Sequence, residues 1–173
     1  MTHVAMWMSL ASAALAASGL AAVPASKPAA LAGESHQIAS VSRDDLLRPR
    51  DASSADGTPI VVYPRQDWRC MTWKFEPAGE DAVRLINYFT HKTFSAEGRD
   101  DAAKVTQHAP TKEATDAQRW RFVPAGDGVY RIEQISGGKV LTVTADGDVV
   151  IDQWKQADSQ KWKLLEKPVK FSG

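Results

Sequence analysis

The chain has 173 residues, of which 43% are hydrophobic and 24% are charged, so it has the composition of an ordinary globular protein with room for one domain. Its 21 basic residues balance 21 acidic ones, and no excess charge indicates nucleic acid or an anionic membrane as a partner. The single cysteine, Cys70, excludes an intrachain disulfide, and a lone cysteine of this kind is typically a small buried side chain.

An alanine-rich apolar stretch opens the chain, from Val4 to Val23, and small residues follow it. Small-residue sequences that suit signal peptidase end at Ala25 and at Ala32, as in a secretory signal peptide. The alternative is an uncleaved membrane anchor, because the first three residues carry no Lys or Arg and about twenty apolar residues just span a bilayer. We expect residues 1–32 to be a signal peptide and short linker, and the protein to be secreted (extracellular or periplasmic) without stable membrane insertion after cleavage.

Short β-branched runs bounded by turn residues follow, and no long helical periodicity occurs. Asp146-Gly147 and the segment 136–139 are hairpin turn signals. The sequence therefore predicts an all-β protein whose strand edges disappear if the sheet closes on itself. The expected strands lie at 38–41, 60–63, 83–86, 129–135, 140–143 and 149–151.

Three similar segments recur among these runs, each with a tryptophan followed by a basic and then an apolar residue. In a strand, this alternation sends the tryptophan and the apolar residue to one face and the basic residue to the other. A spacing of about 45 residues indicates repeated supersecondary units, none of which buries its apolar face alone. The segments are Met71–Phe75, Gln118–Phe122 and Gln160–Leu164, and their tryptophans are Trp73, Trp120 and Trp162.

The order of strand, turn, strand, polar loop and Gln-x-Trp resembles the ricin-type lectin family, over roughly residues 36 to 167. The resemblance implies a β-trefoil of three pseudo-symmetric repeats around a threefold axis. We expect the trefoil domain to span residues 33–168 and the tail at 169–173 to be frayed. No metal ion or other cofactor is expected.

In the ricin-type family a sugar lies in a shallow pocket between a strand aspartate, an aromatic platform and an asparagine just before the Gln-x-Trp. A pyranose has an apolar C–H face and a rim of hydroxyls, so this set of groups suits it. Carried onto the third repeat, the pattern places Trp154 on the platform, Thr142 on the aspartate position, and Ser159, beside Gln160, on the asparagine position. Asp152 is a candidate for the missing carboxylate, because residues two apart face the same side of a strand.

The other two repeats depart further from the family pattern. The second places Ser95 on the aspartate position and His108 on the platform, and the first places Arg48 and Tyr63 there. Tyr63 and His108 are therefore candidates for additional sugar contacts. Because no repeat retains the aspartate, fewer charge-assisted hydrogen bonds are expected to hold a sugar.

Packing alone is the alternative interpretation of several of these residues. The three repeat tryptophans suit a buried core, and Gln118 and Gln160 suit a structural role that ties each loop to its own repeat. Trp154 lies between the polar residues Gln153 and Lys155, which favours partial exposure.

The resemblance implies a non-catalytic carbohydrate-binding protein, with a glycan or a glycoprotein as its partner. The sequence contains no Gly-x-Ser-x-Gly, no HExxH and no Gly-rich phosphate loop, so an enzyme is not expected. The alternative is a protein-binding trefoil, either a protease inhibitor or the cell-binding subunit of a toxin complex, by analogy of fold alone. An inhibitor would act through one protruding loop, such as 99–101 or 110–118, and would be indifferent to the loss of Trp154.

Overall fold

The computed structural model describes residues 31–79 and 81–172, and its regular elements are β-strands and single 3₁₀ turns. The prediction of an all-β protein is confirmed. The 3₁₀ turns that matter below are η2 (Arg50–Ala52), η3 (Arg69–Met71), η4 (Asp116–Gln118) and η5 (Asp158–Gln160). The strands are β1 (Ser35–Ser40), β2 (Leu46–Pro49), β3 (Ile60–Tyr63), β4 (Thr72–Pro77), β5 (Val83–Asn87), β6 (Thr93–Ala96), β7 (Ala103–His108), β8 (Trp120–Gly126), β9 (Val129–Gln134), β10 (Val140–Val143), β11 (Val149–Asp152) and β12 (Trp162–Glu166).

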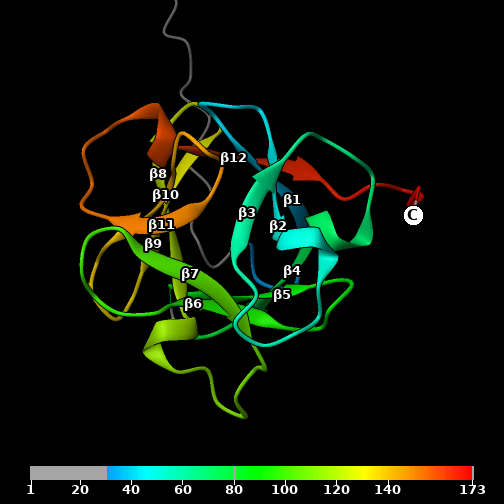
Figure 1. Cartoon of the computed structure of the whole chain (residues 1–173), viewed down its shortest axis with the longest axis horizontal. Helices are drawn as coiled ribbons and strands as arrows, with labels where there is room; N and C mark the ends of the chain where they lie inside the picture. The colour runs from blue at the N-terminus through cyan, green and yellow to red at the C-terminus, as the bar shows by residue number, and fades with distance from the viewer. Residues whose placement is uncertain (1–30, 80, 173) are drawn as a thin grey trace, which may run out of the picture.

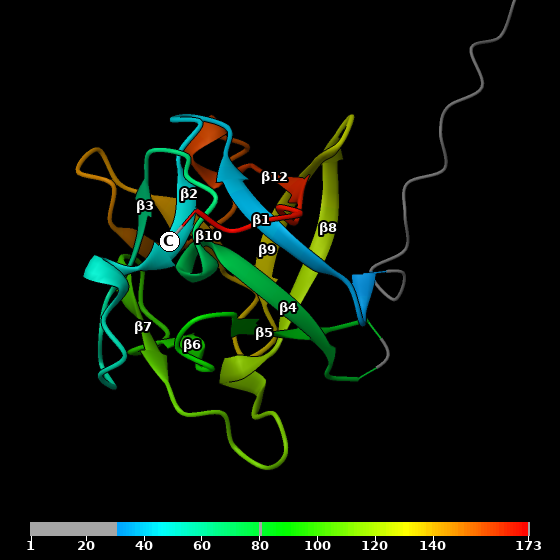
Figure 2. The same cartoon turned by 90° about the vertical axis from the view of Figure 1, so that its right-hand side faces the viewer.

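Six of these strands close into an antiparallel barrel, seen from the side in Figure 2. Strand β1 pairs with β4 and with β12, and the ring continues from β4 to β5, β8, β9 and back to β12. Closure gives each of these strands a neighbour on both sides, which removes the exposed edges that promote aggregation.

The other six strands form three hairpins, β2–β3, β6–β7 and β10–β11, which cover one end of the barrel. Figure 1 looks onto this end, where β3, β7 and β11 meet around the centre. Bridges join these three strands pairwise at Pro59–Thr106, Val61–Asp148 and Val150–Lys104. Each repeat therefore contributes four strands, and the predicted β-trefoil of three pseudo-symmetric repeats is confirmed.

One tryptophan in each repeat fixes its hairpin to the barrel. All three indoles are fully buried, and each Nε1–H donates a hydrogen bond to a main-chain carbonyl in the first strand of its own hairpin. A buried indole needs such an acceptor because an unpaired polar group in the core is costly. The bonds run from Trp73 to Leu47 (3.0 Å), from Trp120 to Phe94 (3.4 Å) and from Trp162 to Leu141 (3.1 Å).

Aromatic rings link the repeats through the core. The Phe94 ring lies 5.1 Å from the Trp73 ring and 5.1 Å from the Trp120 ring, and Phe75 lies 5.1 Å from Phe122. Trp73 and Phe75 are buried while Lys74 between them is exposed, as the alternating pattern predicts. Burial of one such side chain contributes about 1.5–3 kcal/mol.

Both ends of the described chain contact the trefoil. Leu31 is buried in the core, and the Gly33 amide donates to the Phe75 carbonyl at 2.7 Å. Most of the expected signal peptide lies outside the described residues. The tail differs from the expected frayed segment, because the Phe171 ring packs against Tyr88 at 6.0 Å and the Ser172 amide donates to Asp67 O at 2.9 Å. Within residues 31–79 and 81–172, no helix is both long and apolar enough to cross a membrane.

Candidate functional site

The three hairpins carry equivalent positions that the tryptophan hydrogen bonds identify. Arg48, Ser95 and Thr142 each directly follow the residue whose carbonyl accepts the indole N–H bond. The three side chains therefore occupy the same place in their repeats, as the comparison of the three sequences predicts. That place holds a cation in the first repeat and a hydroxyl in the other two.

Strand register corrects the alignment of the aromatic position in the third repeat. Tyr63 pairs with Leu46 and His108 pairs with Thr93, each one residue before the indole acceptor. In the third repeat the partner of Val140 is Asp152, and Trp154 lies two residues further along. The third repeat thus places a carboxylate where the other repeats place a ring, and its indole lies in the loop that follows β11.

The buried side chain of Gln160 holds that loop by hydrogen bonds to its main chain. This side chain is 1% exposed. The Nε2 group donates to Gln153 O at 2.6 Å and to Thr142 Oγ1 at 3.2 Å, and Oε1 accepts from the Lys155 amide at 2.7 Å. Because both neighbours of Trp154 are bound in this way, Gln160 fixes the main chain that presents the indole.

Asp152 is held as an ionised carboxylate at the start of the same loop. Its Oδ2 lies 2.7 Å from Lys155 Nζ, and its Oδ1 accepts from the Gln153 amide at 2.7 Å. The hydrogen bond from Lys155 lowers the pKa of Asp152 from its usual 3.8. Desolvation by burial acts in the opposite direction, but its effect is smaller. The carboxylate is therefore charged at neutral pH, with lone pairs left over for another donor.

The Trp154 indole is half-buried and lies beside the Arg131 guanidinium, with Arg131 Cζ 5.4 Å from the ring centroid. Arg131 is itself paired with Glu133 at 3.3 Å. A cation close to the ring stabilises this orientation of the indole. Thr142 is half-buried, donates to Val140 O at 3.1 Å and accepts from Gln160 Nε2, which leaves one lone pair of its oxygen for another donor. Ser159 is half-buried in η5, next to Gln160.

The aromatic residue of the second repeat is held by a contact within its own strand. His108 is half-buried, and its Nε2 lies 2.9 Å from Thr106 Oγ1 in the same strand. Gln118 plays the same part as Gln160: it accepts from the Thr111 amide at 3.3 Å and donates to Ala109 O at 3.3 Å.

The first repeat contains an aromatic pair that sequence reasoning missed in part. Tyr63 is 42% exposed and stacks on Trp68, with ring centroids 6.0 Å apart at an angle of 28°. The Arg48 guanidinium lies 4.5 Å from the Tyr63 centroid and 5.7 Å from that of Trp68. No spacing rule identifies Trp68, because it comes five residues after Tyr63 in an irregular loop and reaches the ring only through the path of that loop.

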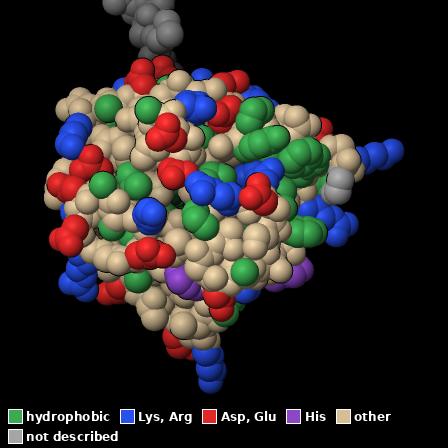
Figure 3. Space-filling view, in the orientation of Figure 1, with side chains coloured by type: hydrophobic (Ala, Val, Ile, Leu, Met, Phe, Trp, Pro, Cys, Tyr) green, Lys and Arg blue, Asp and Glu red, His purple; other side chains and the backbone are tan. Residues whose placement is uncertain are grey.

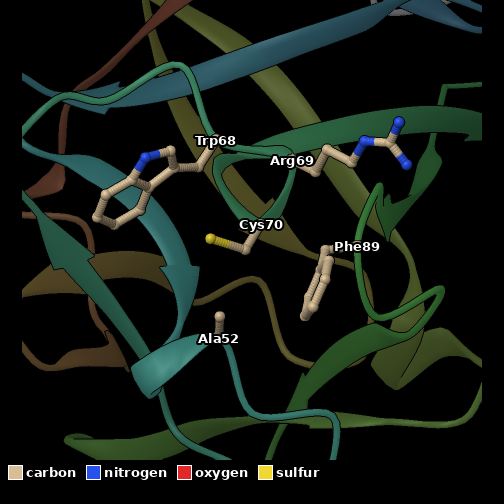
Figure 4. Close-up of a pocket in the computed structure, with 5 residues that line it drawn as sticks. All are labelled: Ala52, Trp68, Arg69, Cys70 and Phe89. Atoms are coloured by element: carbon tan, nitrogen blue, oxygen red, sulfur yellow. The ribbon is translucent and has the colours of Figure 1, made fainter. Parts of the chain in front are cut away.

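An apolar pocket of about 250 Å³ lies next to Trp68 (Figure 4). It is lined by Ala52, Trp68, Arg69, Cys70 and Phe89. Desolvation by burial raises the pKa of the Cys70 thiol, which is therefore protonated at neutral pH. Met71 occupies the position of Gln118 and Gln160, so an apolar cluster replaces the glutamine hydrogen bonds that hold the corresponding loops elsewhere.

Hydrophobic side chains gather on one side of the face shown in Figure 3, at the right of the view, with basic side chains beside them. Tyr63 and Phe89 are the strongly exposed aromatic residues of the described chain, at 42% and 51%. Both belong to the neighbourhood of the Trp68 loop. Among the described residues, aromatic surface is thus accessible at Tyr63 in the first repeat and at Phe89 in the second. It is partly accessible at Trp154 in the third repeat, beside Arg131 and the Asp152–Lys155 pair.

The closed barrel, the three-hairpin cap and the buried tryptophans define a β-trefoil of the lectin type. A family model described as a ricin-type beta-trefoil lectin domain-like family matches residues 64–154 and 116–170, which together cover more than half of the chain. The chain belongs to this family. No curated protein matches the sequence.

Solved structures give the same fold at low sequence identity. The designed threefold-symmetric protein ThreeFoil is 24% identical with a TM-score of 0.72, over 76% of this chain and 98% of that one. A Macrolepiota procera ricin B-like lectin, solved with lactose, is 17% identical with a TM-score of 0.66, over 78% and 96%. The Haemophilus ducreyi cytolethal distending toxin is 19% identical with a TM-score of 0.65, over 88% and 92%.

Proposed function

We propose that this protein is a secreted, non-catalytic lectin that binds a glycan or glycoprotein through its third repeat. The observation that carries the proposal is the loop after β11, where the half-exposed Trp154 follows the ionised Asp152 by two residues. An aromatic face with a carboxylate beside it matches the apolar face and hydroxyl rim of a pyranose. Family membership supports the same class of ligand.

Each residue of the site has its own part in the proposed binding. Trp154 stacks on the sugar ring, and Asp152 accepts hydrogen bonds from sugar hydroxyls through lone pairs that Lys155 and the Gln153 amide leave unused. Thr142 and Ser159 add neutral hydrogen bonds. Gln160 acts by positioning, because its amide is consumed by the protein itself. Tyr63 and His108 provide weaker contacts in the other repeats, and several weak sites together raise the overall avidity.

Secretion follows from the proposed signal peptide, and the position of Leu31 supports one of the two proposed cleavage sites. Leu31 is buried among core residues, and the Glu34 amide donates to its carbonyl at 3.1 Å. Cleavage after Ala32 would remove this residue, whereas cleavage after Ala25 keeps it. We therefore favour Ala25. The intact mass of the secreted protein decides between them, and a first residue of Gly33 would contradict this choice.

A protein-binding trefoil is the second candidate. It is favoured by the loss of the aspartate from all three repeats, where Arg48, Ser95 and Thr142 stand. Similarity in fold to the Haemophilus ducreyi toxin is compatible with a role in a toxin complex. Such a protein would keep its partner when Trp154 is replaced.

A glycan array tests the proposal with the full chain, with Trp154→Ala, and with Phe89→Ala as a matched control. Phe89 is an exposed aromatic outside the proposed site, so its loss removes similar apolar surface. We expect binding to a defined class of sugar that Trp154→Ala lowers at least about tenfold and Phe89→Ala leaves within about twofold. Binding that survives in Trp154→Ala would contradict the third-repeat site, and a blank array with well-folded protein would contradict a lectin.

A further inference from the structure

Arg48 carries a positive charge at a buried position of the first repeat. It stands in β2 where the other repeats have Ser95 and Thr142, and it is only 6% exposed. Its Nε donates to Pro49 O at 3.2 Å. Within the described residues no ion pair joins Arg48 to a carboxylate, although twelve other pairs occur there.

Charge that is buried away from water is normally paired, because desolvation of an ion is costly. Arg48 has partial compensation from the Tyr63 and Trp68 rings, at 4.5 Å and 5.7 Å from its Cζ. Neither of its Nη atoms is among the fully enclosed polar atoms that lack a hydrogen bond in the described chain. Although the residue is only 6% exposed, each Nη atom therefore keeps some contact with solvent, and this contact is where the anion of a ligand would bind.

The aromatic pair beside Arg48 is open to solvent. Tyr63 is 42% exposed, and Trp68 is half-buried at the rim of the apolar pocket. Their rings stack on each other at 28° from parallel, so the part of Tyr63 that remains open to solvent is the aromatic surface a sugar ring would contact. Among the described residues, the cation beside the aromatic surface of the first repeat has no carboxylate partner. In the third repeat, Arg131 and Lys155 are both paired with carboxylates.

We infer that the first repeat is a second binding site, selective for anionic saccharides, in which Arg48 binds a carboxylate or sulfate of the sugar and Tyr63 and Trp68 contact its ring. The inference rests on the proposed lectin function and names a ligand class for a different repeat. Arginine suits this role because its planar fork donates two parallel hydrogen bonds to such a group. A neutral sugar can accept only ordinary hydrogen bonds from Arg48, without the charge pairing that an anionic group gains, so the site favours the charged ligand.

The test titrates the full chain with trigalacturonate and with its methyl ester, which has the same sugar skeleton without the charge. A sulfated galactose trisaccharide forms a third arm and separates sulfate from carboxylate recognition. We expect trigalacturonate or the sulfated sugar to bind at least about tenfold more tightly than the ester, and the preference to shrink as salt is raised. Equal affinity for the charged and neutral probes would overturn the inference.

Three variants locate the site. Arg48→Met keeps the volume of the stem and removes the charge, and it should abolish the preference for the charged probe. Tyr63→Ala, at an exposed position, should weaken binding of the charged probe about fivefold, and it remains informative if Arg48→Met does not fold. Lys112→Met removes the same net charge from an exposed loop of the second repeat and should change nothing. An unchanged preference in Arg48→Met would show that Arg48 only packs.

The outcome also separates this inference from the lectin proposal. Neutral saccharides that bind through Trp154, with no preference for anionic probes, leave the lectin proposal standing and refute the anionic site. Failure of both neutral and anionic saccharides to bind refutes the two together.

Discussion

Single side chains divide into those that hold the trefoil and those that face a ligand, and the tryptophans show the division most clearly. Trp73, Trp120 and Trp162 are fully buried with satisfied N–H groups, whereas Trp154 is half-buried beside Arg131. The residue type is the same in all four, so the energetic role follows from the environment alone.

Replacement of Trp73 by Phe should therefore cost stability. The change leaves the Leu47 carbonyl without its 3.0 Å partner and opens a cavity where the second ring lay. We expect the free energy of unfolding in urea to fall by about 2–4 kcal/mol. Trp154→Phe is the control and should stay within about 0.5–1 kcal/mol of the parent protein. Equal losses for the two variants would contradict the assignment of core and surface.

Protonation of Asp152 sets the acid limit of binding in the third repeat. Its pKa is lowered from 3.8 chiefly by the hydrogen bond from Lys155, so the carboxylate remains charged as pH falls from 7 to 5. A group whose pKa is depressed by folding contributes stability above its unfolded pKa, and this contribution is lost as pH falls through the folded pKa.

Affinity for the third-repeat sugar should accordingly be constant between pH 7 and about 5, and should fall only below about pH 4. Titrations of the parent and of Asp152→Asn across this range measure the effect. The variant should bind more weakly at pH 7 and lose the acid transition. A midpoint near pH 6 in the parent would mean that a group other than Asp152 controls binding.

At the scale of elements, the loop between β11 and β12 distinguishes the third repeat, because it carries Trp154 of the proposed sugar site. Gln160 holds this loop by three hydrogen bonds, and Gln118 holds its counterpart in the second repeat. The first repeat has Met71 and an apolar cluster instead. The glutamine is thus the part of the sequence motif that determines the shape of the adjacent loop.

Gln160→Met should loosen the loop that carries Trp154, and Gln118→Met is the matched control in another repeat. Both should lower the free energy of unfolding by about 1–3 kcal/mol, because buried carbonyl and amide groups lose their partners. Only Gln160→Met should also weaken sugar binding and speed hydrogen exchange of the Lys155 amide. If both variants weakened binding equally, the effect would come from global destabilisation and not from the loop.

The three repeats could be predicted from the sequence because each four-strand unit contains one copy of the buried tryptophan segment. The three repeat tryptophans aligned Arg48, Ser95 and Thr142 in the sequence, and the indole hydrogen bonds confirm that these three positions are equivalent. Sequence reasoning misplaced Trp154 because the register between β10 and β11 depends on their hairpin turn. Asp152, and not Trp154, pairs with Val140 as a result.

At the scale of the whole molecule, pseudo-symmetry in the core permits asymmetry at the surface. The barrel and the bridges between β3, β7 and β11 hold the three repeats alike, while their outer loops carry different chemistry. The Trp68 loop exists only as a tertiary feature, which is why its stacking on Tyr63 could not be derived from spacing. One trefoil can in this way present two kinds of site without a change in its core.

Indole N–H resonances of the full chain, followed during titration with the sugar that binds best on the array, test the central claim most directly. The six tryptophans give separate reporters, and Trp154→Phe assigns the third-repeat signal. The account predicts that a neutral sugar shifts the Trp154 resonance and leaves those of the buried Trp73, Trp120 and Trp162 in place. Saturable binding that leaves the Trp154 resonance unmoved would contradict the proposed site.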